Sequence, residues 1–312
     1  MNRLFITFTG CLSALLLSTS AYAAKVTVSI PPLAGIIAPL LDEDDTLEVI
    51  LKSGVSPHGF QLRPSHMMAV ANSDLVVTVG FGADTWLQKA LKSYKGAQVN
   101  MADLSRMRLY SVRRGGVWQA AEIGGHDHEK AADMSGVDPH LWTAASNAIE
   151  VVIEVSDQLI ALSPEKTKVI TERRDKWLAR IKQVDHEVFM VLNPVSRTPY
   201  LVLHDAFQYF EKRYLMTVVG SISLNPEIAP SLKRVFELRE RIEKDEISCV
   251  FKEPQFSDKR VQPVVDGLNV KVGQLDPMGI NYDADGRATG YLLYDDFLKQ
   301  TALQFVNCLA DK

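Results

Sequence analysis

Two stretches in which apolar runs alternate with helical patterns flank one long helical segment, and this arrangement restricts the fold more than any other feature. The apolar runs have the length and composition of strands buried on both faces. We expect strands at residues 26–30, 47–52, 74–80, 200–203, 217–222, 249–252 and 270–275. We expect helices at residues 34–41, 64–72, 85–94, 143–162, 206–213, 230–246, 259–268 and 295–309. This alternation predicts parallel βαβ units on both sides of the long segment.

The long segment covers residues 163–192 and contains no glycine, and no proline after Pro164. As a helix it would be roughly 42 Å long, which is unusual inside a compact domain and suits a strut between two lobes. The predicted fold class is α/β, with two lobes, each a mainly parallel sheet flanked by helices, joined by one long rigid helix. We divide the chain into a signal peptide (1–23), an N-terminal lobe (24–162) with a mobile loop (111–137), the linking helix (163–194) and a C-terminal lobe (195–312).

The N-terminus has the three parts of an export signal. Arg3 is followed by an apolar stretch at residues 4–17, and residues 21–23 (AYA) match the pattern at which a signal peptidase cuts. The stretch is too short and too interrupted by Ser and Thr to span a bilayer, and no later segment is apolar enough to do so. We therefore expect a mature, periplasmic chain that begins at Ala24.

The charge balance argues against one class of partner. The chain carries 34 Lys and Arg residues against 38 Asp and Glu residues, a net charge of −4. It has no basic cluster interleaved with aromatic residues, which is the pattern of nucleic-acid binding. We expect no nucleic-acid partner.

Three cysteines are present, and Cys11 leaves with the signal peptide. In an oxidising compartment an even pair is usually bonded, so we predict a disulfide between Cys249 and Cys308. The bridge would tie a strand to the last helix. Two buried free thiols are the alternative.

Four residues with metal-binding side chains stand where ligands collect in α/β folds. His58, His204 and Asp276 each lie after a predicted strand, and His140 stands just before a predicted helix. Ligands of open α/β sheets gather at the carboxyl ends of the strands. Two of the four residues come from each half of the chain, so a site that uses all four lies in the cleft between the lobes. Three imidazoles and one carboxylate suit a tetrahedral Zn²⁺ ion.

Other interpretations of these residues stay open. Taken singly, each histidine is more often a hydrogen-bonded loop residue than a ligand. A zinc-dependent enzyme is the leading alternative function, because a catalytic zinc keeps one position open for water and needs a general base nearby. The sequence has neither a His-Glu-x-x-His nor a Gly-x-Ser-x-Gly motif, and Asp276 would fill the open position, so we expect no enzyme. A surface adhesin or a zinc buffer is a third possibility.

Five segments of the chain resemble a known protein family. They are residues 56–65 (SPHGFQLRPS), 138–142 (DPHLW), 204–211 (HDAFQYFE), 253–256 (EPQF) and 275–279 (LDPMG). In this order they are similar to the zinc-uptake (ZnuA-type) substrate-binding proteins of ABC transporters, within the cluster A-I metal receptors. The resemblance covers almost the whole mature chain. It implies two α/β lobes bridged by one long helix, with the ion buried between them.

The resemblance also implies roles for single residues. It makes His58, His140 and His204 the imidazole ligands. It makes Asp276 the carboxylate ligand and supports the Cys249–Cys308 disulfide. The manganese receptors of this superfamily carry a carboxylate in place of His204, as a harder ion prefers. We therefore expect Zn²⁺ as the bound metal and keep a manganese receptor as the alternative.

The chain departs from the family pattern beside the first histidine. Some zinc receptors carry a Glu there, whereas this chain has Pro57 and Gly59. That leaves Asp276 or a water as the fourth donor. The imidazole rings also need hydrogen-bond acceptors outside the coordination shell. Asp205 and Glu253 are the candidates, although Asp205 also suits the cap of the following helix.

The family's histidine-rich loop is reduced here to residues 126–129 (HDHE). His126 and His128 alternate with carboxylates, and we expect them to form a weak secondary zinc site. A solvated loop without a metal is the alternative. In either case the main site would keep its affinity when the two histidines are lost.

The expected function is that of a high-affinity receptor of an ABC importer, which captures periplasmic Zn²⁺ and delivers it to the permease at the inner membrane. A periplasmic metallochaperone is a second class of partner, and we expect the receptor to be a monomer. The long helix would limit hinge motion between the lobes. Release of zinc would then use local loop movement and small lobe shifts, with the permease favouring the weaker-binding state.

Overall fold

The computed structural model describes residues 23–114, 118, 136–223 and 225–310. The N-terminal part builds a four-stranded sheet in which all neighbouring strands are parallel. The strand order is β2-β1-β3-β4, with β1 at Lys25–Val28, β2 at Thr46–Val49, β3 at Leu75–Thr78 and β4 at Ala97–Asn100. All four residues of the central strand β3 are buried, as in a parallel sheet that helices cover on both faces.

The C-terminal part builds a second parallel sheet of four strands. The order is β6-β5-β7-β8, with β5 at Tyr200–Val202, β6 at Val218–Ser221, β7 at Cys249–Lys252 and β8 at Lys271–Gln274. The two sheets therefore have the same topology: across each sheet the strands follow the order second, first, third and fourth of their sequence order. The predicted class, two α/β lobes with parallel sheets, is confirmed.

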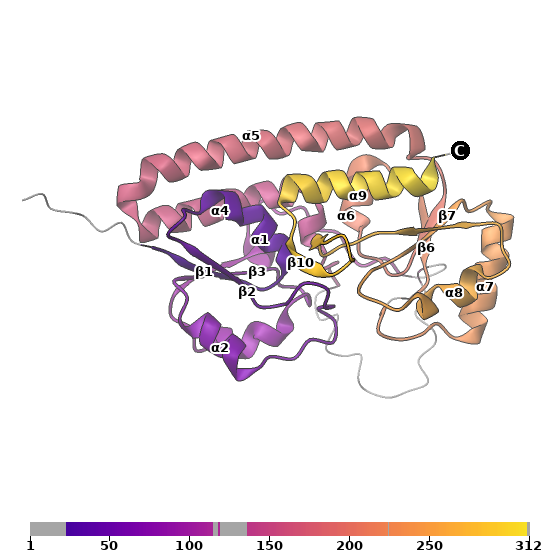
Figure 1. Ribbon diagram of the computed structural model, residues 1–312, viewed down its shortest axis with the longest axis horizontal. Helices are drawn as coiled ribbons and strands as arrows, with labels where there is room; N and C mark the ends of the chain where they lie inside the picture. The colour runs from indigo at the N-terminus through magenta and orange to yellow at the C-terminus, as the bar shows by residue number, and fades with distance from the viewer. Residues whose placement is uncertain (1–22, 115–117, 119–135, 224, 311–312) are drawn as a thin grey trace, which may run out of the picture.

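Helix α5 (Thr167–Leu192) runs along one side of both lobes (Figure 1). Helices α4 (Ala145–Leu162) and α9 (Tyr294–Leu309) pack against it. The buried residues of α5 recur every three, four or seven positions and form one apolar stripe: Ile170, Trp177, Ile181, Val184, Val188 and Leu192. The predicted long helix is confirmed, except that its first turn, Pro164–Lys166, is a 3-10 helix.

The shorter helices flank the two sheets. They are α1 (Pro31–Ile37), α2 (Pro64–Ala71), α3 (Gln88–Leu91), α6 (Gln208–Tyr214), α7 (Leu232–Lys244) and α8 (Gln262–Val265). Two of them are much shorter than expected. The predicted helix at 85–94 starts as the 3-10 helix Thr85–Leu87, and the one at 259–268 starts as the 3-10 helix Asp258–Arg260.

Three strands were not expected from the sequence. Strand β4 is an edge strand with one buried residue. Strands β9 (Ile280–Tyr282) and β10 (Ala288–Tyr291) form an antiparallel hairpin whose residues are mostly exposed or half-buried. Their segments (AQVN, INY and ATGY) contain no apolar run of strand length, so apolar periodicity does not reveal them. The hairpin packs against α1 of the other lobe, so the last part of the chain contacts both lobes.

One apolar core runs through both lobes. It includes Val26 and Leu75 of the first sheet, Tyr200 of the second, and Phe305 of α9. Cys249 of β7 and Cys308 of α9 form the predicted disulfide, with Cα atoms 6.0 Å apart. The shared core and this bridge fix the second sheet to the helical layer.

Three predictions about the division of the chain are not tested by the structure. Residues 1–22 of the predicted signal peptide lie outside the described residues, and so does most of the predicted loop at 111–137. The lobe boundaries remain a prediction. Among the described residues, no helix combines the length and the apolar character that a membrane span requires.

Candidate metal centre

Three of the four predicted ligands come together between the lobes. His58 lies in the loop after β2, and His140 precedes the 3-10 helix Leu141–Thr143 that leads into α4. His204 follows β5 after one intervening residue. Each of the three residues offers a ligand nitrogen, and these nitrogens all lie within 4.8 Å of one another. Within the described part of the chain, this is the group that meets the distance expected of a metal site.

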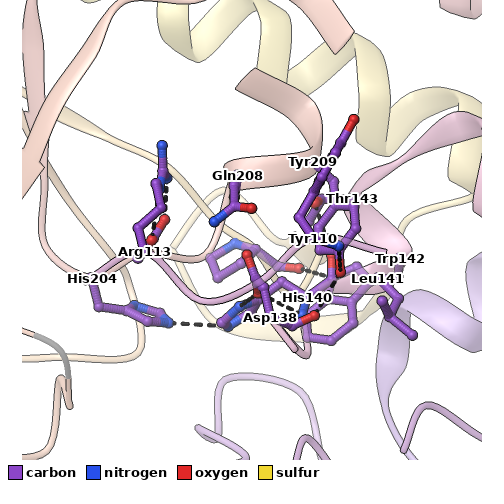
Figure 2. A network of polar contacts seen from close by, with 12 residues as sticks. Tyr110, Arg113, Asp138, His140, Leu141, Trp142, Thr143, His204, Gln208 and Tyr209 are labelled. Atoms are coloured by element: carbon purple, nitrogen blue, oxygen red, sulfur yellow. Dashed lines mark hydrogen bonds and ion pairs between the residues drawn. The ribbon is translucent and has the colours of Figure 1, made fainter. Parts of the chain in front are cut away.

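The distances within the group fit one small ion. The Nε2 atoms of His140 and His204 point at each other and are 3.3 Å apart (Figure 2). Two nitrogens bound to one tetrahedral zinc at about 2.05 Å would be separated by about 3.4 Å. The ring centre of His58 lies 5.2 Å from that of His204 and 6.2 Å from that of His140. The three rings therefore surround a single position.

Two buried carboxylates face the far side of the imidazole rings. The Nδ1 of His140 is 2.8 Å from Asp138 Oδ1, and the Nδ1 of His204 is hydrogen-bonded to Glu253. When each Nδ1–H donates to its carboxylate, the tautomer is fixed and each Nε2 keeps a lone pair for a metal. Asp138 also accepts a hydrogen bond from the backbone N–H of His140, which locks the loop around the ligand.

Of these acceptors, Glu253 was among the candidates from the sequence and Asp138 was not. Asp138 stands two residues before His140, and that spacing was the available signal. Asp205, the other candidate, serves a different purpose. Its carboxylate accepts from Arg113 Nε at 2.8 Å, and Arg113 also contacts Glu211 at 2.6 Å.

The local environment keeps two of the imidazoles neutral. Burial and the charge of His140 lower the pKa of His204 to about 3. The pKa of His58 is also well below its usual value, because the crowded protein around the ring and the other two histidines disfavour its charged form. By accessible surface His58 is nonetheless the exposed member of the group. His58 is therefore a neutral imidazole at the solvent-exposed side of the histidine group.

His140 and Glu253 hold protons more strongly. Burial alone lowers the pKa of His140, but the charge and hydrogen bond of Asp138 outweigh it, so this pKa is raised. Burial raises the pKa of Glu253 to about 8. A metal on Nε2 of His204 would add positive charge next to Glu253 and favour its ionised form, which accepts the Nδ1–H. Binding of a metal here would therefore be coupled to the release of protons.

The structure places Asp276 next to the cleft and outside the histidine group. Asp276 directly follows the Leu275 that ends the predicted strand, and it is buried. Its carboxylate accepts hydrogen bonds from the backbone N–H groups of Met278 and Ile280, each at 2.9 Å, and from Gln255 Nε2 at 2.6 Å. Its assignment as the fourth ligand remains a prediction. The predicted secondary site, His126 and His128, lies outside the described residues.

The three histidines line a small cleft between the lobes. The other lining residues come from both sides: Ser56, Pro57, Trp142, Glu253, Gln255, Phe256, Pro277 and Met278. The indole N–H of Trp142 donates to the carbonyl oxygen of Pro277 at 2.7 Å, which joins the two lobes at the floor of the cleft. The walls thus combine three imidazoles whose ring nitrogens lie close together with apolar side chains, an arrangement that can enclose and desolvate one cation.

Comparisons with known proteins show the family to which the chain belongs. The family model described as "Zinc-uptake complex component A periplasmic" (ZnuA) matches residues 26–308. The high-affinity zinc uptake system protein ZnuA of Yersinia pestis is 31% identical over 308 residues, which is 95% of each chain. A crystal structure of ZnuA superimposes with a TM-score of 0.73 at 20% identity, over 93% of this chain and all of that one. The periplasmic zinc-binding protein TroA of Treponema pallidum gives 0.74 at 21% identity with the same coverage. The chain belongs to the ZnuA family of periplasmic zinc-uptake components.

Proposed function

We propose that this protein is the zinc receptor of an ABC importer, which binds one Zn²⁺ ion between its lobes and delivers it to the membrane permease. One observation carries the proposal: three imidazoles from both halves of the chain converge, with two Nε2 atoms 3.3 Å apart. We assign His58, His140 and His204 as ligands. Asp276 or a water molecule supplies the fourth donor.

The donor set supports zinc rather than manganese. Imidazole nitrogen suits zinc, and harder ions such as manganese favour carboxylate and water oxygen. In this site the nearest carboxylates, Asp138 and Glu253, are hydrogen-bonded to Nδ1 atoms. They orient the imidazole rings by accepting hydrogen bonds from Nδ1, and the Nε2 atoms remain directed toward the ion.

The same contacts argue for a binding protein rather than an enzyme. A catalytic zinc needs a general base within reach of its bound water. Asp138 and Glu253 are each occupied by an imidazole, and Asp276 by three donors. We propose that these carboxylates orient imidazoles and loop backbone and do not act as a general base, and that the site stores the ion.

Delivery follows from the location and the construction of the lobes. We propose that residues 1–23 direct export to the periplasm and that the mature monomer begins at Ala24. The apolar core shared by the lobes and α5 opposes a wide hinge motion, so release uses loop movement at the cleft when the permease binds. His126 and His128 would form an accessory zinc site. A metallochaperone would be a second partner.

Zinc stoichiometry and affinity, measured by competition with a chelator on the exported protein, test the proposal. We expect one tightly bound ion in the wild type and loss of tight binding in His204→Ala. His186→Ala, in α5, is the matched control and should bind like the wild type. The His126→Ala/His128→Ala double variant should keep the tight site. Tight binding that survives His204→Ala would mean that the site lies elsewhere.

A further inference from the structure

Gln255 stands between the cleft and Asp276. Its side chain lines the cleft together with the three histidines, and Asp276 is absent from that lining. The amide nitrogen of Gln255 donates to Asp276 Oδ1 at 2.6 Å. The side-chain amide of Gln255 therefore separates the cleft from Asp276, the carboxylate that would complete a zinc site, and is hydrogen-bonded to it.

The hydrogen bonds of Asp276 show what this amide occupies. A carboxylate oxygen has two lone-pair directions. On Oδ1, one accepts from the N–H of Met278 and the other from Gln255, while Oδ2 accepts from the N–H of Ile280. Displacement of Gln255 would free one acceptor position on Oδ1 and leave both backbone bonds in place to orient the carboxylate.

Gln255 is itself incompletely bonded in this position. Its Oε1 atom is buried and has no hydrogen-bond partner among the described residues. A buried acceptor without a partner destabilises the arrangement that contains it. Gln255 therefore holds Asp276 at the cost of an unsatisfied Oε1 atom. A rotation of the side chain toward the open cleft would let Oε1 accept a hydrogen bond from water.

We propose that Gln255 is a positioning residue that keeps Asp276 out of the coordination shell, and that Zn²⁺ replaces the Gln255 amide on Asp276 Oδ1. This rests on the proposed zinc-binding function. The receptor would then have two states, a three-histidine site that loads and releases zinc and a four-ligand site that retains it. The Gln255–Asp276 hydrogen bond favours the first state, so this contact lowers the affinity and speeds release.

A double-mutant cycle tests the proposal, with zinc affinity and dissociation rate measured by chelator competition. Gln255→Leu removes the amide and keeps most of the volume. It should tighten zinc binding about tenfold, the order expected when one hydrogen bond to a charged acceptor no longer competes. In an Asp276→Asn background the same change should alter the affinity by less than about twofold. A purely structural effect of Gln255 would be the same in both backgrounds.

Two further variants keep the test decisive. Gln262→Leu removes another Gln–Asp hydrogen bond, to the exposed Asp266 outside the cleft, and should leave zinc binding unchanged. Gln255→Ala replaces Gln255→Leu if the latter does not fold. Weaker zinc binding in the Gln255 variants, or equal changes with and without Asp276, would overturn the inference. If the wild type still binds zinc tightly and this binding depends on His204, either of these results would overturn the inference about Gln255 but not the proposed receptor function.

Discussion

At the scale of residues, the site depends on pairs in which a buried carboxylate sets the direction of an imidazole. Asp138 directs His140, and Glu253 directs His204. Each pair leaves Nε2 toward the cleft, so the two rings are already oriented as the proposed zinc site requires. Loss of such an outer contact typically lowers metal affinity by about 10- to 100-fold.

Replacement of Asp138 tests this arrangement. Asp138→Asn keeps the shape of the side chain but removes the charge that favours the Nδ1–H tautomer of His140. We expect zinc affinity to fall by about 10- to 100-fold. Asp157→Asn, at an exposed position of α4, is the matched control and should leave the affinity unchanged. Equal affinities in the two variants would show that Asp138 does not orient the ligand.

The pH dependence of zinc binding follows from the protons that the free site holds. The raised pKa of His140 and the pKa of about 8 for Glu253 mean that both groups bind protons near neutral pH. Zinc displaces these protons, so affinity should rise with pH by about tenfold per pH unit for each proton released, and the contribution of Glu253 should level off above about pH 8. His58 and His204, with lowered pKa values, are already neutral in this range. Chelator competition between pH 5.5 and 8.5 measures this slope, and a flat profile would contradict the release of protons from His140 and Glu253 when zinc binds.

At the scale of elements, the disulfide joins the second sheet to the helical layer. Cys249 is in a central strand and Cys308 is near the end of α9. Because α9 also packs against α5 and α1, the bridge fixes the lobe through a helix that contacts both halves of the molecule. None of the three histidines belongs to either element: His58 follows β2, His140 precedes α4 and His204 follows β5.

Loss of the disulfide should therefore affect stability more than zinc binding. The Cys249→Ala/Cys308→Ala variant should lose about 2–4 kcal/mol of unfolding free energy, since the bridge restricts the unfolded chain. Urea unfolding of the zinc-free protein, followed by circular dichroism, measures the loss. The variant should still bind zinc as tightly as the wild type at temperatures where it is folded. A large loss of zinc affinity in the folded variant would show that the bridge shapes the site.

The sequence indicated the elements that stand in apolar runs or apolar stripes and missed the short strands that do not. The buried run of β3 and the apolar stripe of α5 were evident from their periodicity, whereas β4 and the β9–β10 hairpin were not. In the site, strand ends and family motifs pointed to the three histidines. The positioning role proposed for Gln255 could not be predicted from the sequence, because it depends on a hydrogen bond to Asp276 that forms only when the two loops lie side by side.

At the scale of the whole molecule, two lobes of equal topology are joined more tightly than a single linker would allow. Helices α4, α5 and α9 pack together, and one apolar core extends through both lobes. The indole of Trp142 also bonds across the cleft floor. A wide hinge closure would disrupt this packing, so the lobes are expected to keep their relative placement when zinc binds.

Small-angle X-ray scattering tests this rigidity. The radius of gyration should be the same, within error, for the zinc-free and the zinc-bound protein. Binding proteins that close around a hinge become more compact when loaded. A clear decrease on addition of zinc would contradict the account of a rigid pair of lobes with local loop movement.

X-ray absorption at the zinc edge of the loaded, exported protein tests the central claim most directly. The account predicts one zinc per chain, with three imidazole nitrogens and one oxygen at about 2.0–2.2 Å, and loss of one imidazole contribution in His58→Ala. Fewer than three imidazoles in the wild type, or an unchanged spectrum in His58→Ala, would show that the ion is not held by the three histidines between the lobes.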